Sequence, residues 1–127
     1  IKVDILVTAA IPDLIKMSDI NKIKAELIVE GSNIPMTAEI EEKLYKKGIL
    51  IVPDFVANAG GVISSYAEHL GQTPEEMFKL VEKKITKNTQ VILNHAKEKK
   101  IKPRDAGMEI AIERVRSKCK VCKIPEN

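Results

Sequence analysis

The sequence is poor in aromatic residues, and this shortage bears on the partners that it can bind. It has no Trp, two Phe and two Tyr among 127 residues, so it lacks the side chains on which nucleic-acid bases stack. Its net charge of +3 arises from 21 basic and 18 acidic residues. These are interleaved, as in the stretch 97–100, which is typical of a solvated helix surface. We therefore predict no nucleic-acid partner.

Cysteine is almost as scarce, with Cys119 and Cys122 as its two occurrences. A zinc site needs about four ligands, and the sequence has no second pair to complete one. A redox-active pair is expected in the first turn of a helix that follows a strand, whereas this pair ends a predicted helix. We interpret both residues as free thiols, and we predict no metal site.

Long apolar runs and targeting patterns are also missing. No run approaches the roughly 18 to 20 residues that a membrane-spanning helix needs, and the start shows no signal-peptide pattern. Both observations predict a cytoplasmic protein with no membrane association. The sequence begins with Ile1 rather than Met and enters an apolar run almost at once. From this we expect a part of a longer protein.

Three short apolar runs predict a parallel β-sheet. They span residues 3–7, 27–29 and 49–52. Each is rich in β-branched residues and continuous rather than alternating, which is typical of strands buried on both faces. Helical patterns lie between them, a weak one at 12–24 and a clearer one at 37–47 that opens on Thr37. Strands and helices in this order predict an α/β fold with crossover connections.

The rest of the sequence predicts helices. Residues 58–61 have the composition of a turn, and a short helix is expected over 62–70. The stretch 73–76 reads Thr-Pro-Glu-Glu, a capping-box pattern that opens a helix to about residue 100. A last helix is expected from Pro103. Its predicted core face consists of Met108, Ala111, Ile112 and Val115.

Small and amide residues follow each predicted strand, at 8–10, 31–33 and 58–61. In open α/β sheets, ligands bind beyond the C-terminal ends of the strands. Small residues let a ligand approach the backbone closely. The side chains of Asn33 and Asn58 can donate and accept hydrogen bonds, which suits a carboxamide or a ribose hydroxyl. On spacing alone, the alternative that these residues serve only turn geometry stays open.

Candidates for acid–base catalysis are few. We interpret His69, near a helix end, and His95, in a Lys-rich helix, as surface residues. Asp54 follows a strand end, where it is either a turn residue or a functional one. The sequence shows no Ser-His-Asp order and no Gly-rich phosphate loop. We therefore name no catalytic residue in this chain.

Three segments carry a resemblance to a known family. Residues 52–66, VPDFVANAGGVISSY, resemble the most distinctive segment of glutamate dehydrogenases, within the Glu/Leu/Phe/Val dehydrogenase family. Residues 29–33 resemble the Glu-Gly-Ala-Asn turn of that family, and residues 3–10 resemble its Asp-Ile-Leu-Val-Pro-Ala-Ala segment. The resemblance covers essentially the whole chain. It implies the second half of a Rossmann-like doubly wound parallel sheet, with three strands followed by C-terminal helices.

The resemblance also implies an activity and a cofactor. Glutamate dehydrogenases of this family interconvert glutamate with 2-oxoglutarate and ammonia, use NAD or NADP, and are usually homohexamers. By resemblance, Ala9 and Ala10 line the cofactor cleft through backbone contacts. Asn33 and Asn58 reach the nicotinamide ribose or carboxamide.

Two further residues are implied to face the substrate side chain, Val62 and Ser65. The Ser65 hydroxyl can hydrogen-bond the side-chain carboxylate of glutamate. Leucine dehydrogenases resemble this segment but carry an apolar residue at that place. A buried hydroxyl that faces a leucine side chain would stay unpaired, which costs about 1–3 kcal/mol. Ser65 therefore favours glutamate as the substrate.

The family pattern places its catalytic Lys and Asp in an N-terminal substrate domain, and no segment here matches that domain. Nothing matches the glycine-rich dinucleotide fingerprint either. We therefore expect residues 1–57 to be the last three strand–helix units of a nucleotide-binding domain and residues 58–127 to be its C-terminal helices. Such a fragment would be inactive alone. Two alternatives stay open, a stand-alone non-enzymatic half-domain used for oligomerisation or regulation, and a fragment of a leucine or other apolar amino-acid dehydrogenase.

Overall fold

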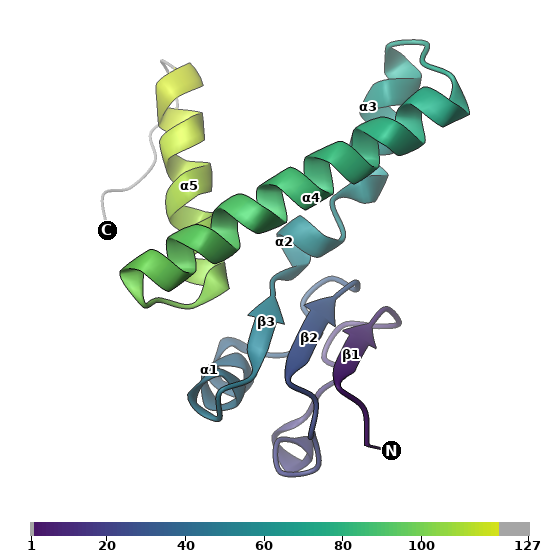
Figure 1. Cartoon of the computed structure of the whole chain (residues 1–127). Coiled ribbons are helices and arrows are strands. Elements are labelled where there is room, and N and C mark those ends of the chain that lie inside the picture. The colour runs from purple at the N-terminus through teal and green to yellow at the C-terminus, as the bar shows by residue number, and fades with distance from the viewer. Residues whose placement is uncertain (1, 120–127) are drawn as a thin grey trace.

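The computed structural model describes residues 2–119, which form a parallel sheet with helices packed on it (Figure 1). The strands are β1 (Ile5–Thr8), β2 (Leu27–Glu30) and β3 (Leu50–Val52), and they lie in the order β1-β2-β3. Val7 pairs with Val29, and Val29 pairs with Val52. The predicted α/β fold and its three parallel strands are confirmed. Because all three strands point the same way, the loops that follow them meet at one edge of the sheet.

One face of the sheet carries the main hydrophobic core. Helix α1 (Ala38–Lys46) begins as predicted, since the Thr37 side chain accepts a hydrogen bond from the Ile40 backbone N–H at 3.5 Å. Leu44 of α1 packs with Ile28 and Ile51 of the sheet, and all three are at most 1% exposed. Burying one such side chain stabilises the fold by about 1.5–3 kcal/mol. This core fixes the sheet against α1.

The opposite face of the sheet is open, so the prediction that all strands are buried on both faces is wrong. On this face Ile5 is 56% exposed, Val7 is 58% exposed and Leu50 is 41% exposed. The side chains of β1 therefore alternate between an open and a covered face. The covering layer is missing because the helices after β3 reach the sheet mainly at β3 and at the end of β2.

The predicted helix over residues 12–24 is wrong. The segment has one turn of 3-10 helix, η1 (Met17–Asp19), and is otherwise irregular. The backbone N–H groups of Asp13 and Ile15 donate to the carbonyls of Ile34 and Pro35, each at 2.9 Å. These long-range bonds replace helical ones, because the irregular apolar spacing of the segment gives no continuous helix face to bury.

The predicted turn at 58–61 is shorter than expected. A four-residue helix, α2 (Asp54–Ala57), precedes it, and α3 (Gly60–His69) already includes Gly60 and Gly61. The sequence does not reveal α2, because four residues are too few to show a helical period. The turn therefore consists of Asn58 and Ala59, which brings Asn58 directly to the end of α2.

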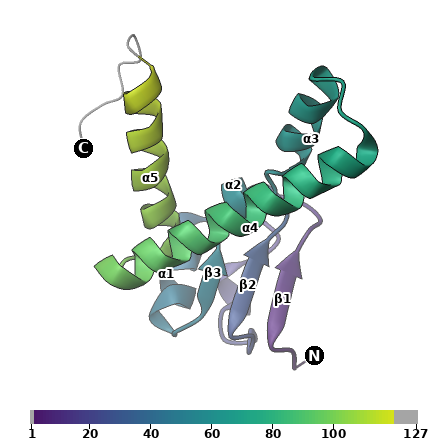
Figure 2. The same cartoon turned by 45° about the horizontal axis from the view of Figure 1, so that its top comes forward.

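The last two helices are long and cross one another. Helix α4 (Pro74–Lys99) opens on the predicted capping box, and α5 (Pro103–Lys118) follows after a short connection. Figure 2 shows α3 near one end of α4 and α5 at its other end. The predicted core face of α5 is wrong, since Met108 is 47% exposed and Val115 is 43% exposed. Instead α5 buries Ala106 and Gly107.

This different rotation of α5 has a local cause. A Cβ atom added at Gly107 would lie 2.8 Å from the ring of Phe55 and 3.3 Å from Ile92. The missing side chain of Gly107 therefore lets α5 approach both α2 and α4. Val56, Ile92, Ala96 and Ala106 form the second hydrophobic core at this contact.

Two predictions made above concern single features. Within residues 2–119, no helix is both long and apolar enough to cross a membrane. Cys119, at the C-terminal end of α5, is disulfide-bonded, so the prediction of a free thiol there is wrong. Cys122 lies outside the described residues.

Candidate functional site

The loops that follow the three strands form a pocket of about 540 Å³. It is lined by Ala9, Ala10, Pro12, Gly31, Ser32, Asn33, Asn58, Gly61 and Val62. The structure thus brings together all four predicted cofactor residues and one of the two predicted substrate residues. The pocket lies beyond the C-terminal ends of parallel strands, where open α/β sheets bind ligands. Its volume is within the range of small-molecule sites.

The two predicted asparagines contact each other across this pocket. The side-chain amide of Asn58 donates a hydrogen bond to the side-chain carbonyl of Asn33, although the residues are 25 positions apart. The bond leaves the Asn33 amide group as a donor and the Asn58 carbonyl as an acceptor. Such a neighbouring donor and acceptor can match the complementary groups of a carboxamide.

The backbones of the first two strand-end loops approach one another closely. The N–H of Ser32 donates to the Thr8 carbonyl at 2.7 Å. A Cβ atom added at Gly31 would lie 3.1 Å from that same carbonyl oxygen, closer than ordinary contact. Gly31 therefore lets the two loops lie side by side and keeps backbone groups at the pocket wall.

Ser65 is not among the lining residues of this pocket. It lies one helical turn beyond Val62 on α3, on the same side of the helix. Its hydroxyl donates to the Gly61 carbonyl at 3.1 Å, which leaves its oxygen lone pairs as acceptors. Val62 is 78% exposed. The predicted substrate side of the site is therefore open to solvent in this chain.

Directly behind the pocket lies a buried cluster of charges that the sequence did not predict. The guanidinium of Arg104, from α5, binds Glu30 at 2.6 Å, Glu41 at 2.7 Å and Asp54 at 2.9 Å. Glu30 is fully buried, and the side chain of Asp54 is 11% exposed. Planar guanidinium groups suit such multiple carboxylate contacts. We call these four residues the Arg104 cluster.

The carboxylates of the Arg104 cluster also bind backbone groups at the pocket. Glu30 accepts from the Asp54 N–H at 2.8 Å, and Asp54 accepts from the Ile34 N–H at 2.9 Å. Ile34 directly follows Asn33, and Asp54 begins the short helix that ends before Asn58. Through these backbone hydrogen bonds, the cluster fixes the segments that carry Asn33 and Asn58.

Burial perturbs the titration of the cluster. Burial raises the pKa of Glu30 to about 7, although the charge of Arg104 opposes this rise. Burial also acts to raise the pKa of Asp54, but hydrogen bonds from the Ile34 N–H and Arg104 outweigh it and leave this pKa below its ordinary value. The Oε1 atom of Glu30 is buried, with no hydrogen-bond partner among the described residues. Burial, with a smaller contribution from the repulsion by Glu41 and Asp54, therefore lets Glu30 hold its proton up to about neutral pH.

The sequence offers only an indirect signal for this cluster. Arg104 lies 74, 63 and 50 positions from Glu30, Glu41 and Asp54, and no periodic pattern connects residues that far apart. The available signal is that Glu30 and Asp54 adjoin apolar strands. A charge next to a buried strand needs a partner.

The histidines contribute nothing to the pocket. The Nε2 atom of His95 lies 2.8 Å from Glu109 at the surface, where Lys99 also binds Glu109. His69 is an exposed residue at the end of α3. Among the described residues, no group of His, Cys, Asp and Glu side chains is arranged to hold a metal ion. Polar chemistry at the pocket therefore comes from amides, hydroxyls and backbone groups.

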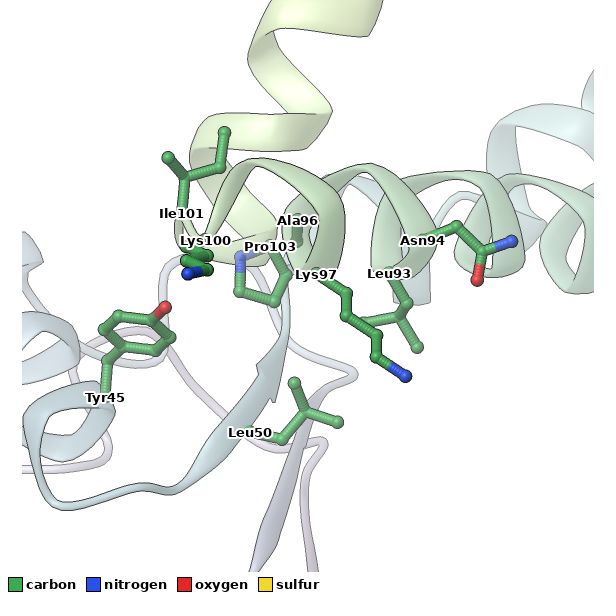
Figure 3. Close-up of a pocket in the computed structure, with 9 residues that line it drawn as sticks. All are labelled: Tyr45, Leu50, Leu93, Asn94, Ala96, Lys97, Lys100, Ile101 and Pro103. Carbon is green, nitrogen blue, oxygen red and sulfur yellow. The ribbon is translucent and has the colours of Figure 1, made fainter.

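A second cavity, of about 510 Å³, lies between α1, β3, the C-terminal half of α4 and the connection from α4 to α5 (Figure 3). Apolar residues such as Leu50, Leu93 and Pro103 form most of its wall. Lys97, Lys100 and the Tyr45 hydroxyl lie at its margin, and no acidic or histidine side chain lines it. It therefore offers a packing surface rather than a set of converging polar groups.

Comparison with known proteins agrees with this geometry. The family model for Glutamate/Leucine/Phenylalanine/Valine dehydrogenase matches residues 1–121. The glutamate dehydrogenase of Aeropyrum pernix is 44% identical over 124 residues, which is 89% of this chain and 29% of that protein. The NADP(+)-dependent glutamate dehydrogenase of Pyrobaculum calidifontis is 39% identical, over 89% of this chain and 28% of that protein. The chain thus spans less than a third of the length of these relatives.

Solved structures show the same fold. The L-tryptophan dehydrogenase of Nostoc punctiforme superposes with a TM-score of 0.82 at 33% identity, covering 92% of this chain and 35% of that one. The glutamate dehydrogenase of Peptoniphilus asaccharolyticus superposes with a TM-score of 0.80 at 30% identity, covering 90% of this chain and 30% of that one. From its sequence, its fold and its strand-end pocket, the chain belongs to the glutamate/leucine/phenylalanine/valine dehydrogenase family.

Proposed function

We propose that this chain is part of the nucleotide-binding domain of an NAD(P)-dependent glutamate dehydrogenase. In this proposal, residues 1–57 are the last three strand–helix units of the domain and residues 58–127 are its C-terminal helices. The limited share of the relatives that the chain spans supports this proposal. So does the open face of β1, where Ile5 and Val7 are exposed at the edge of the sheet. A bare edge with apolar side chains favours pairing with further strands.

The observation that carries the proposal is the paired amides at the strand-end pocket. Asn33 and Asn58 present one donor and one acceptor beside backbone groups that small residues leave accessible. The residues present therefore fit the nicotinamide half of a dinucleotide, with its ribose and carboxamide. When bound, NAD or NADP supplies the acceptor for the hydride that leaves the glutamate α-carbon.

The chain's own residues would bind and orient rather than transfer protons. Asn33 and Asn58 would bind the nicotinamide carboxamide or its ribose and so hold the cofactor in the pocket. Ala9 and Ala10 would line the cleft with backbone groups. The proton transfers of the reaction would rest on residues outside this chain, so the chain alone should not turn over glutamate.

The substrate is proposed from Val62 and Ser65. Both lie on the same side of α3, and the Ser65 hydroxyl can donate a hydrogen bond to a substrate carboxylate after rotating away from Gly61. The relatives named as glutamate dehydrogenases agree with glutamate. A hexamer is a further part of the proposal, because the family that the sequence resembles usually forms homohexamers.

The proposal is tested on the full-length protein that contains this chain. We expect glutamate-dependent reduction of NAD or NADP. Leucine and tryptophan are assayed as alternative substrates, and both should react more slowly than glutamate. Replacing Asn58 with Ala should raise the KM for the dinucleotide by roughly fivefold, since one hydrogen bond is worth about 1 kcal/mol. The matched control is Asn94→Ala, because Asn94 lies on α4 and lines the second cavity.

Each contrary outcome has a separate meaning. A full-length protein without dehydrogenase activity would refute the enzyme assignment and favour a non-enzymatic role in oligomerisation or regulation. A preference for leucine would refute the substrate proposal alone. An unchanged KM in Asn58→Ala would show that the dinucleotide binds elsewhere. Turnover by the isolated chain would show that catalytic residues lie within residues 1–127.

A further inference from the structure

The position of Arg104 differs from that of an ordinary surface arginine. It lies in the first turn of α5, and its guanidinium donates through three different nitrogens to three carboxylates. Those carboxylates belong to three separate elements, since Glu30 ends β2, Glu41 lies in α1 and Asp54 opens α2. One side chain therefore joins α5 to the sheet, to α1 and to α2.

Two of these carboxylates act on the pocket loops through backbone hydrogen bonds. Asp54 accepts the Ile34 N–H with one oxygen and binds Arg104 with the other. Glu30 accepts the Asp54 N–H with the same oxygen that binds Arg104. A displacement of the guanidinium would thus move the start of α2 and the residue after Asn33 together.

Helix α5 also packs against α2 through the aromatic ring of Phe55. The Arg104 guanidinium carbon lies 5.7 Å from the centre of the Phe55 ring, a distance compatible with a cation–π interaction. The backbone of Gly107, one turn further along α5, approaches the far edge of the same ring. Helix α2 is therefore held at Asp54 by charge and at Phe55 by packing. These two contacts fix the orientation of α2 and therefore the position of Asn58, which directly follows it.

We propose that Arg104 is a positioning residue of the cofactor pocket, which sets the separation and orientation of Asn33 and Asn58 through Asp54 and Glu30. This inference deepens the proposed function and rests on it for its kinetic readout. Arg104 does not line the pocket, so it acts only through the residues that it holds. Its contribution should therefore appear in cofactor binding rather than in the chemical step.

The test uses Arg104→Met and Arg104→Lys in the full-length protein. Arg104→Met keeps an unbranched side chain but removes every donor, whereas Arg104→Lys keeps the charge and loses the fork geometry. The matched control is Arg114→Met, because Arg114 lies on the same helix, is exposed, and donates a surface hydrogen bond to Asn88. For each variant, KM for NADH and NADPH, kcat, and amide hydrogen exchange are measured.

For the kinetics, Arg104→Met should raise the KM for the dinucleotide at least about fivefold, as for one lost hydrogen bond, with kcat changed by less than about twofold. Arg104→Lys should lie between Arg104→Met and the wild type. Arg114→Met should match the wild type. A KM equal to that of the wild type in Arg104→Met, at a temperature where the variant stays folded, would overturn the proposal.

Hydrogen exchange gives a readout that needs no activity. The N–H groups of Ile34 and Asp54 each donate to a carboxylate of the cluster, so both should exchange faster in Arg104→Met and stay protected in Arg114→Met. Unchanged protection would overturn the positioning role even if the protein proved to have another activity. If Arg104→Met does not fold, Asp54→Asn replaces it, with the same expected rise in KM and faster exchange at Ile34. An inactive wild type would refute the proposed function, while exchange would still decide whether Arg104 holds the two loops.

Discussion

Replacing Glu30 with Gln should flatten the pH dependence of stability in this chain. Glu30 is fully buried, accepts hydrogen bonds with one carboxylate oxygen, and has no partner for the other among the described residues. Glutamine has the same shape and keeps one carbonyl oxygen to accept from Asp54 and Arg104. The substitution therefore removes the titration of Glu30 with little change in packing.

The magnitude follows from the titration of Glu30. Burial, opposed by Arg104, raises its pKa from an ordinary 4.5 to about 7. Between these two values the folded state binds a proton that the unfolded chain has released, so stability falls as the pH rises. The loss amounts to about 3 kcal/mol in total, and it is complete above pH 7. Below pH 4.5 both states are protonated and the contribution of Glu30 is fully present.

Other carboxyl groups affect stability in a different pH window. The pKa values of Asp19, Glu42, Asp54 and Glu109 all lie below their ordinary values. The stability that these groups contribute is present at neutral pH and is lost as the pH falls through their ordinary values toward the lowered ones. A comparison made between pH 5 and pH 8 therefore separates the titration of Glu30 from that of these carboxyl groups, and the comparison with Glu30→Gln cancels the groups that both proteins share.

Urea denaturation of the chain, followed by circular dichroism, measures this effect. The free energy of unfolding is determined at pH 5, 6, 7 and 8 for the wild type and Glu30→Gln. The wild type should lose up to about 3 kcal/mol relative to the variant across this range, with most of the loss below pH 7. Two curves that stay parallel within about 0.5 kcal/mol would refute the raised pKa of Glu30.

Two further substitutions test packing and substrate choice. Gly107→Ala should destabilise the fold by about 1–3 kcal/mol in urea denaturation, because its Cβ would lie 2.8 Å from the Phe55 ring. In the control Gly61→Ala, the added Cβ meets no atom within 4 Å, so this variant should be neutral or more stable. An equal effect of both variants would refute the close contact. Ser65→Val in the full-length protein should lower kcat/KM for glutamate by roughly fivefold or more relative to leucine, and an unchanged ratio would contradict a role for Ser65 in substrate choice.

The parts of the fold that sequence reasoning predicted are those with local signals. Continuous β-branched runs located the three strands, and the capping box beginning at Thr73 located the start of α4. The parts that it missed depend on contacts between distant residues. The backbone of segment 12–24 forms hydrogen bonds to Ile34 and Pro35 instead of helical ones. Helix α5 turns Gly107 to the core because the Phe55 ring leaves no room for a Cβ atom there.

The candidate site divides in the same way. The small residues and asparagines after each strand predicted the pocket, because parallel strands bring their ends to one edge. The Arg104 cluster was not predicted, because Arg104 lies on a helix 74 positions after Glu30 in the sequence. The open face of β1 contradicts the expectation of burial on both faces, since a continuous apolar run does not show which face another layer covers.

The central claim is that the strand-end pocket holds the nicotinamide half of a dinucleotide. It is tested most directly by a crystal structure of the full-length protein with NADH or NADPH bound. The account predicts the nicotinamide carboxamide or its ribose within hydrogen-bond distance of Asn33 and Asn58. A dinucleotide bound elsewhere, for example in the second cavity between α1, β3 and α4, would contradict it.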